Sequence, residues 1–118
     1  MRLITVLALC SILGACEKHE PLPAGITGDA ERGKLLLRQY GCGACHSIPG
    51  VAVAKGNVGP PLEGIAKRVY LAGVLPNTPE NMTRWIRAPR EIDPRTGMPD
   101  LHVPEPHARD MVAYLYRL

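Results

Sequence analysis

One short stretch, Cys42-Gly43-Ala44-Cys45-His46, constrains what this chain can fold into more than any other. It spells C-x-x-C-H, the attachment signal for a c-type haem, in which both thiols bond to the porphyrin and the histidine binds the iron. If the stretch is helical, Cys42 and His46 lie four residues apart on one side, which suits a flat ligand lying across that side. We therefore expect a domain that folds around one covalently bound haem c.

Other sites also use a C-x-x-C pattern, and these alternatives are a redox disulfide and a structural zinc site. A thioredoxin-like disulfide expects a βαβ setting, and none is visible in the sequence. A zinc site needs a second pair of ligands, for which His102 and His107 are the candidates, because no cysteine follows Cys45. The adjoining histidine favours haem, although a disulfide, zinc or a chance match remains open.

Length and composition support a domain that needs a cofactor to complete its core. The 118 residues allow one small domain. With no phenylalanine and one tryptophan, a core made of protein alone would be thin, and a buried macrocycle would supply the missing apolar area. The formal net charge of +3 is small and its basic residues are dispersed, so we expect no nucleic-acid partner.

The start of the chain carries a separate signal. Arg2 precedes an apolar run over 3–13 that is too short to span a bilayer comfortably and that is followed by the small residues Gly14 and Ala15. The tetrad Leu13-Gly14-Ala15-Cys16 resembles the bacterial lipobox, and this resemblance implies cleavage before Cys16 and a lipid on its thiol. A secretory signal cut near Ala15 and a short retained anchor are the alternatives. We expect an exported protein, lipid-anchored on the periplasmic side of a bacterial membrane.

These features divide the chain into three segments: a signal peptide at 1–15, a lipidated tether at 16–27 and a haem-binding domain at 28–118. Pro21 and Pro23 and the lack of an apolar period favour a tether before the domain.

Within the domain we expect four helical segments, over 29–40, over 65–69, from 79 to just before Pro89, and over 105–117. The stretches 47–63, 70–77 and 90–104 are expected to be irregular or extended. Asp29 is a good helix cap, and Thr78-Pro79-Glu80 forms a strong helix start. Gly33 lowers helix propensity in the middle of the first helix, which indicates that another element approaches closely there. We expect that element to be the last helix.

An iron bound by His46 has one further axial position, and its occupant decides between an electron carrier and a ligand-binding haem. The candidates are three methionines and two histidines: Met82, Met98, Met111, His102 and His107. Met98 lies in Gly97-Met98-Pro99, on a loop where a core-filling methionine would be out of place. Met82 and Met111 occupy core-facing positions on expected helices, where packing is the ordinary role. We therefore expect His46 and Met98 to ligate the iron.

The order of these motifs resembles a class I monohaem cytochrome c over about 28–118. The matching pieces are, in order, Gly28-Asp29-Ala30 with Gly33, the CGACH motif, Gly59-Pro60-Pro61-Leu62, Trp85-Ile86, Met98-Pro99 and Asp110-Met111-Val112-Ala113-Tyr114-Leu115. The resemblance implies an all-α fold of roughly three to five helices around one covalently bound haem, with the N- and C-terminal helices crossing. It also implies that the Pro60 carbonyl accepts the second ring proton of His46.

The stretch over 70–99 is similar to cytochromes that serve, or are fused to, haem-copper oxidase subunits. In that family, groups at the positions of Tyr70, Trp85 and Arg68 hold the haem propionates, while a core role for Trp85 remains an alternative. The chain departs from the family at two places. Leu37 stands where phenylalanine is common, and Pro104 stands where a serine or threonine cap is frequent.

Together these observations predict an electron-transfer protein and not an enzyme. A haem held by imidazole and thioether has no free position, so it gains and loses single electrons. We expect a respiratory carrier with a terminal oxidase or a dehydrogenase as partner. The alternatives are a haem-based gas or redox sensor, a catalytic haem with an open sixth position, and a fixed electron-transfer subunit of an oxidase or dehydrogenase.

Overall fold

The structure is a computed structural model that describes residues 21–118. The expected signal peptide at 1–15, the lipidation site Cys16 and the first part of the tether lie outside the described residues. The described part contains four α-helices, a two-stranded ladder and two 3-10 turns. These are α1 Ala30–Gln39, the turn Cys42–Ala44, the turn Ile65–Lys67, β1 Tyr70–Leu71, β2 Leu75–Pro76, α2 Pro79–Arg87, α3 Pro89–Ile92 and α4 Glu105–Leu115.

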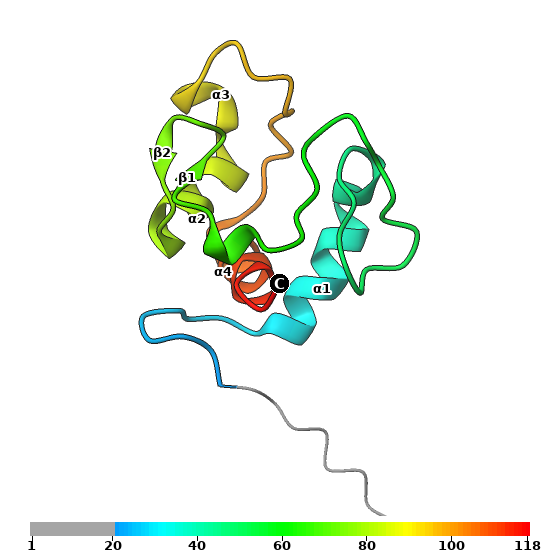
Figure 1. Ribbon diagram of the computed structural model, residues 1–118, viewed down its shortest axis with the longest axis vertical. Helices are drawn as coiled ribbons and strands as arrows, with labels where there is room; N and C mark the ends of the chain where they lie inside the picture. The colour runs from blue at the N-terminus through cyan, green and yellow to red at the C-terminus, as the bar shows by residue number, and fades with distance from the viewer. Residues whose placement is uncertain (1–20) are drawn as a thin grey trace, which may run out of the picture.

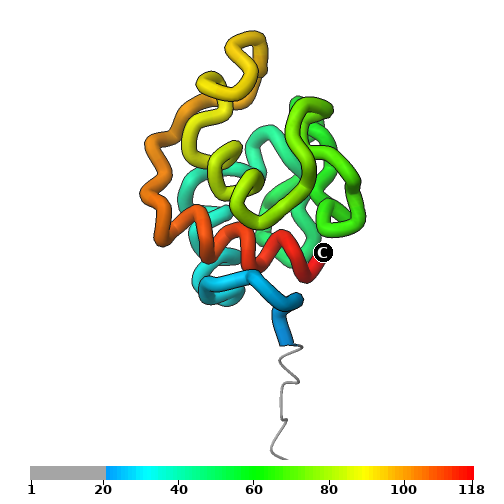
Figure 2. Tube along the Cα trace, turned by 90° about the vertical axis from the view of Figure 1, so that its left-hand side faces the viewer, coloured from blue at the N-terminus to red at the C-terminus, as the bar shows by residue number. Residues whose placement is uncertain are grey.

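Helices α1 and α4 pack against each other and form the base of the domain (Figure 1). The loop over 47–63 lies on one side of this pair, and the β1–β2 hairpin with α2 lies on the other. The chain entering α1 runs past α4 (Figure 2), where a Cβ atom on Gly28 would lie 2.6 Å from the Arg109 carbonyl oxygen.

Gly33 lies where the backbones of α1 and α4 come closest. A Cβ atom at this position would lie 1.9 Å from the carbonyl oxygen of Asp110, which leaves no room for a side chain. The expectation that the last helix approaches the first closely at Gly33 is therefore confirmed, and the reason is steric.

Local capping explains where the long helices begin. The Asp29 carboxylate accepts hydrogen bonds from the backbone N–H groups of Glu31 and Arg32, each at 3.0 Å. The Thr78 hydroxyl accepts from the Asn81 N–H at 3.2 Å, and Pro79 opens α2. Both helix starts agree with the prediction from the sequence. The side-chain oxygens accept hydrogen bonds from N–H groups that have no partner inside the helix. Pro104 precedes α4 without any side-chain cap.

The core is one apolar cluster that both terminal helices share. Leu36 and Leu37 of α1 are buried. So are Ala108, Met111, Val112 and Leu115 of α4, which recur at helical spacing and form one stripe. Leu22 and Ile26 are partly buried against the same cluster. The packed region therefore begins before residue 28, within the stretch expected to be a tether.

The segment after Gly41 forms a short 3-10 turn, Cys42–Ala44. Two local expectations are wrong. The stretch 70–77 is not irregular, because Leu71 pairs with Leu75 in an antiparallel ladder around a turn with positive φ at Ala72 and Gly73. The stretch 90–104 is not extended throughout, because α3 makes one helical turn from Pro89 to Ile92. Each of these elements is held by hydrogen bonds between residues two to five positions apart. Hydrophobic periodicity does not reveal such short elements, because it needs a longer stretch of sequence.

Among residues 21–118, no helix is both long and apolar enough to cross a lipid bilayer.

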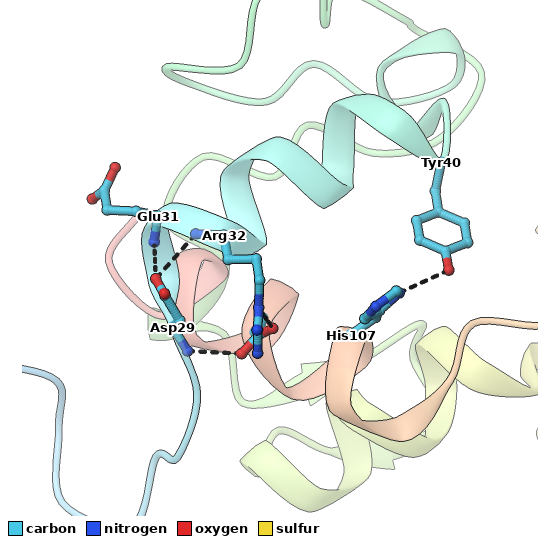
Figure 3. A network of polar contacts seen from close by, with 6 residues as sticks. Asp29, Glu31, Arg32, Tyr40 and His107 are labelled. Atoms are coloured by element: carbon cyan, nitrogen blue, oxygen red, sulfur yellow. Dashed lines mark hydrogen bonds and ion pairs between the residues drawn. The ribbon is translucent and has the colours of Figure 1, made fainter.

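A buried carboxylate ties the two terminal helices together (Figure 3). The Asp110 side chain is 2% exposed and accepts hydrogen bonds from the Asp29 N–H at 2.8 Å and from Arg32 Nε. Burial by itself raises the pKa of Asp110, but the bonds from Arg32 and Asp29, with the charges of Arg32 and His107, outweigh it and hold this pKa below its usual value. At the other end of α1, Tyr40 Oη is hydrogen-bonded to His107 Nδ1 at 3.0 Å (Figure 3).

We expect Asp110→Asn to lower stability at neutral pH by about 1.5–3 kcal/mol, the usual worth of a hydrogen bond to a charged group. A carboxylate with a depressed folded pKa stabilises the fold above its unfolded pKa of about 4 and loses that contribution as the pH falls through the folded pKa. The wild type should therefore lose more stability between about pH 5 and pH 2 than the variant does. Urea unfolding over a pH series measures both effects.

Asp93→Asn is the matched control, because the pKa of Asp93 is also lowered, mainly by the Arg95 N–H, yet its charged partner Arg95 is 89% exposed. This variant should lower stability at neutral pH by less than Asp110→Asn does, because solvent screens the exposed pair with Arg95. Equal pH dependence of Asp110→Asn and the wild type would contradict the role assigned to Asp110.

Candidate cofactor-binding site

The Cys42–His46 motif makes one tight turn that directs its three reactive side chains into a single cavity. The His46 N–H donates to the Cys42 carbonyl at 3.0 Å, and the Cys45 N–H donates to the same oxygen at 3.3 Å. The side chains of Cys42, Cys45 and His46 all line this cavity. Although the turn is not α-helical, it keeps the grouping that the C-x-x-C-H spacing predicts.

The loop over 47–63 closes around this turn through backbone contacts. The Gly56 N–H donates to the Gly43 carbonyl at 3.0 Å, and the Gly59 N–H donates to the Cys45 carbonyl at 2.8 Å. A Cβ atom on Gly56 would lie 2.5 Å from the Ala44 carbonyl oxygen. Glycine is therefore required there because the two backbones touch, and this contact fixes the motif from outside the cavity.

The His46 ring makes a hydrogen bond at one edge and packs against the backbone of Gly59. Its Nδ1 atom lies 2.7 Å from the Pro60 carbonyl oxygen, the contact that the family resemblance implies. Because a carbonyl only accepts, Nδ1 carries a proton, and in the neutral imidazole Nε2 then keeps a free lone pair. A Cβ atom on Gly59 would lie 2.4 Å from His46 Cε1, so the ring packs directly against this glycine.

The cavity has a volume of about 360 Å³, within the range of small-molecule and cofactor sites. Its wall is mainly apolar and combines residues from both terminal helices with residues of α2 and the loop before α4. Among the wall residues are Leu37, Leu62, Ile65, Ile86, Val103 and Leu115. The site thus draws on segments that lie far apart in the sequence.

The structure divides the five axial-ligand candidates into those that line the cavity and those that do not. Met82, Met98 and Met111 line the cavity, whereas His102 and His107 are not among its lining residues. Met82 is 2% exposed and Met111 is fully buried, both on helices. Met98 is only partly buried, and its N–H donates to Thr96 Oγ1 at 3.2 Å within the loop that follows α3.

The three residues expected to hold propionates, Arg68, Tyr70 and Trp85, also line the cavity. Arg68 Nη2 donates to the Pro61 carbonyl and, at 3.4 Å, to the Glu63 carbonyl. These bonds fix a positive charge at the cavity wall without neutralising it. Tyr70 is 58% exposed and lies at the rim.

The chemical state of the thiols bears on how the motif can act. Cys42 and Cys45 are both free. Burial raises the pKa of the Cys42 thiol, and the charge of Cys45 adds to this effect, so Cys42 stays protonated at neutral pH. Redox-active cysteines show the opposite tendency, because a lowered pKa is what makes a thiol an effective nucleophile.

The residues present fit a covalently held porphyrin. Two free thiols, an imidazole with one free nitrogen, a thioether, an apolar wall and a fixed guanidinium share one cavity. Within residues 21–118, no three histidine, cysteine or acidic side chains converge as they would in a metal site built from those residue types.

Sequence reasoning missed one residue that shapes this site, Asn77. Because the stretch 70–77 was expected to be irregular, Asn77 was assigned no role. Its side chain bonds to Ile65, Arg68 and Tyr116, partners that no local pattern could have indicated.

Comparison with known proteins gives one informative similarity. No family model matches the chain. Over 92 residues, which are 75% of this chain, it is 32% identical to the cytochrome c oxidase subunit 2 of Alkalihalophilus pseudofirmus. The match spans 25% of that protein's length. The chain is thus distantly similar to one part of an oxidase subunit.

We expect Gly59→Ala to displace the His46 ring and break its hydrogen bond to Pro60, because the new methyl group would overlap the ring. In protein labelled with ¹⁵N-histidine, the Nδ1–H signal of His46 should be protected from exchange in the wild type and lost in the variant. Gly97→Ala is the control, because nothing lies within 4 Å of a Cβ atom there. Retention of the protected signal in Gly59→Ala would show that the ring is held in another way.

Proposed function

We propose that this chain is a single-electron carrier with one covalently bound haem c, ligated by His46 and Met98, and that its helices form the class I cytochrome c fold. The observation that carries the proposal is the sharing of one apolar cavity by the Cys42 and Cys45 thiols, His46 and Met98. The close contact of α1 and α4 at Gly33 supports the fold.

Each group in the cavity has a defined task. The thiols of Cys42 and Cys45 would each add across one vinyl group of the porphyrin and hold the cofactor through thioether links. The Pro60 carbonyl favours the His46 tautomer that would present Nε2 to the iron. The apolar wall excludes water, and Arg68 offers a positive charge to the propionates. When bound, the haem supplies an iron that accepts and releases one electron.

Met98 is the best sixth ligand because of where it lies. Met82 and Met111 are enclosed on helices within the apolar cluster, where they fill space. Met98 belongs to an extended loop next to Pro99 and contributes to the cavity wall from outside that cluster. A thioether raises the reduction potential relative to a second histidine. With both axial positions filled, the protein would carry electrons and would not be an enzyme.

The proposed setting is respiratory electron transfer on the periplasmic side of a bacterial membrane, with a lipid on Cys16 as the anchor. Similarity to a cytochrome c oxidase subunit supports an oxidase, rather than a dehydrogenase, as the partner. It supports equally a diffusing carrier and a fixed subunit, and co-purification of an oxidase with the full-length protein would distinguish these two.

We expect Met98→Ala to abolish the weak near-infrared band that sulfur-to-iron charge transfer produces in the oxidised protein. The reduction potential should fall by on the order of 0.1 V or more, because axial ligands set haem potentials over a range of about 0.8 V. Optical spectroscopy and a redox titration of protein made in a haem-competent host measure both.

Met82→Leu is the control for this prediction, since it removes a sulfur from the same cavity at nearly constant volume and should keep the band. Rapid carbon monoxide binding by the reduced wild type would support the sensor alternative. A wild type without covalent haem at Cys42 and Cys45 would contradict the proposal as a whole.

We expect the mature protein to begin at Cys16, to carry lipid there and to fractionate with membranes. Mass spectrometry of the membrane fraction tests this, with Cys16→Ser expected to prevent lipid attachment. Cys10→Ser is the matched control, because this cysteine lies within the expected signal peptide. A freely soluble, unmodified wild type would rule the anchor out.

A further inference from the structure

Asn77 lies where four segments of the described structure meet. It directly follows β2 and directly precedes Thr78, the cap of α2. Its backbone N–H donates to the Val69 carbonyl at 2.9 Å. Its side chain reaches the turn Ile65–Lys67 and Tyr116, the residue that ends α4.

Every hydrogen-bonding atom of the Asn77 amide is used. The two Nδ2 protons go to the carbonyls of Ile65 and Arg68, both at 2.8 Å. Its Oδ1 atom accepts from the Tyr116 hydroxyl at 2.9 Å. An amide with two donors and one acceptor fits these three partners, and a carboxylate or an apolar side chain of the same size does not. Burial raises the pKa of Tyr116, with the charge of Glu80 adding to the effect, so its hydroxyl stays a donor at neutral pH.

These bonds act on the segment that carries Arg68 and Tyr70 into the cavity wall. Asn77 holds the backbone on both sides of Arg68, at the carbonyls of Ile65 and Val69, as well as the carbonyl of Arg68 itself. The Arg68 side chain then reaches the Pro61 and Glu63 carbonyls. The position of the guanidinium therefore depends on a backbone that Asn77 fixes.

We propose that Asn77 is a positioning residue that holds the Arg68 guanidinium at the cavity wall and thereby raises the reduction potential of the site. This inference rests on the proposed function, because it assigns a consequence to a redox centre in the cavity. A fixed positive charge beside that centre favours the reduced form, which carries one positive charge fewer, and the effect is strong where apolar walls lower the dielectric constant. Without Asn77, the segment is released and the guanidinium moves toward solvent, so the potential falls.

The test compares the reduction potentials of haem-loaded full-length proteins. Asn77→Leu and Arg68→Gln should each lower the potential, and the double variant should show no larger shift than Arg68→Gln alone. Such non-additivity distinguishes action through Arg68 from a general loosening of the fold. Additive shifts, or an unchanged potential in Asn77→Leu, would overturn the inference.

Asn81→Leu is the matched control. Asn81 lies on α2, its Nδ2 bonds to the Pro76 carbonyl at 3.0 Å, and it is not among the residues that line the cavity. The same substitution there should leave the potential unchanged. If Asn77→Leu fails to fold, Tyr116→Phe tests the inference in its place, because it removes only the O–H donor to Asn77. This variant should also lower the reduction potential, but by a smaller amount.

Hydrogen exchange gives a readout that does not depend on haem. The amides over 65–70, the stretch to which Asn77 bonds, should exchange faster in Asn77→Leu and Tyr116→Phe than in the wild type or in Asn81→Leu. Equal exchange in all four proteins would overturn the positioning role. A wild type that lacks covalent haem would contradict the proposed function and with it the effect on potential, while faster exchange would still show that Asn77 holds the segment.

Discussion

The contact between the backbones of α1 and α4 at Gly33 is the constraint on which the rest of the structure depends. It joins the two ends of the described chain, with the Asp110 carboxylate bonded across the contact to Asp29 and Arg32. Because the helices approach so closely, Leu37 from α1 and Met111 and Leu115 from α4 reach the wall of one cavity. A bulkier residue at position 33 would move these helices apart and displace the residues that they contribute to the cavity wall.

A second set of contacts binds the loop after the motif to the motif itself and so supports His46. The loop over 47–63 bonds to the motif through the backbone at Gly56 and Gly59, and Pro60 then meets the imidazole. Among residues 21–118, no buried side-chain nitrogen or oxygen lacks a hydrogen-bond partner. The polar groups near the cavity are thus held in place, and its interior is left largely to apolar side chains and sulfur. Such a site suits a large apolar cofactor better than a small polar substrate.

Much of this arrangement could be predicted, and the reasons are local. Asp29 and Thr78 cap helices because their side-chain oxygens satisfy nearby N–H groups. The α4 stripe is buried because its apolar residues recur at helical spacing. The β1–β2 ladder and α3 were not predicted, since each comprises only a few residues and has no periodicity to detect. Asn77 was missed because its partners Ile65 and Tyr116 are distant in sequence and lie on both sides of it.

The sequence by itself determined the chemistry that is available: two thiols and an imidazole at fixed spacing, a methionine between glycine and proline, and a glycine in the first helix. Short-range covalent geometry is enough to bring Cys42, Cys45 and His46 together. Only the tertiary structure decided which distant groups join them, because that depends on how helices and loops pack. It placed Met98 and Arg68 on the cavity wall, left His102 and His107 outside it, and gave the Asn77 side chain its three partners, Ile65, Arg68 and Tyr116.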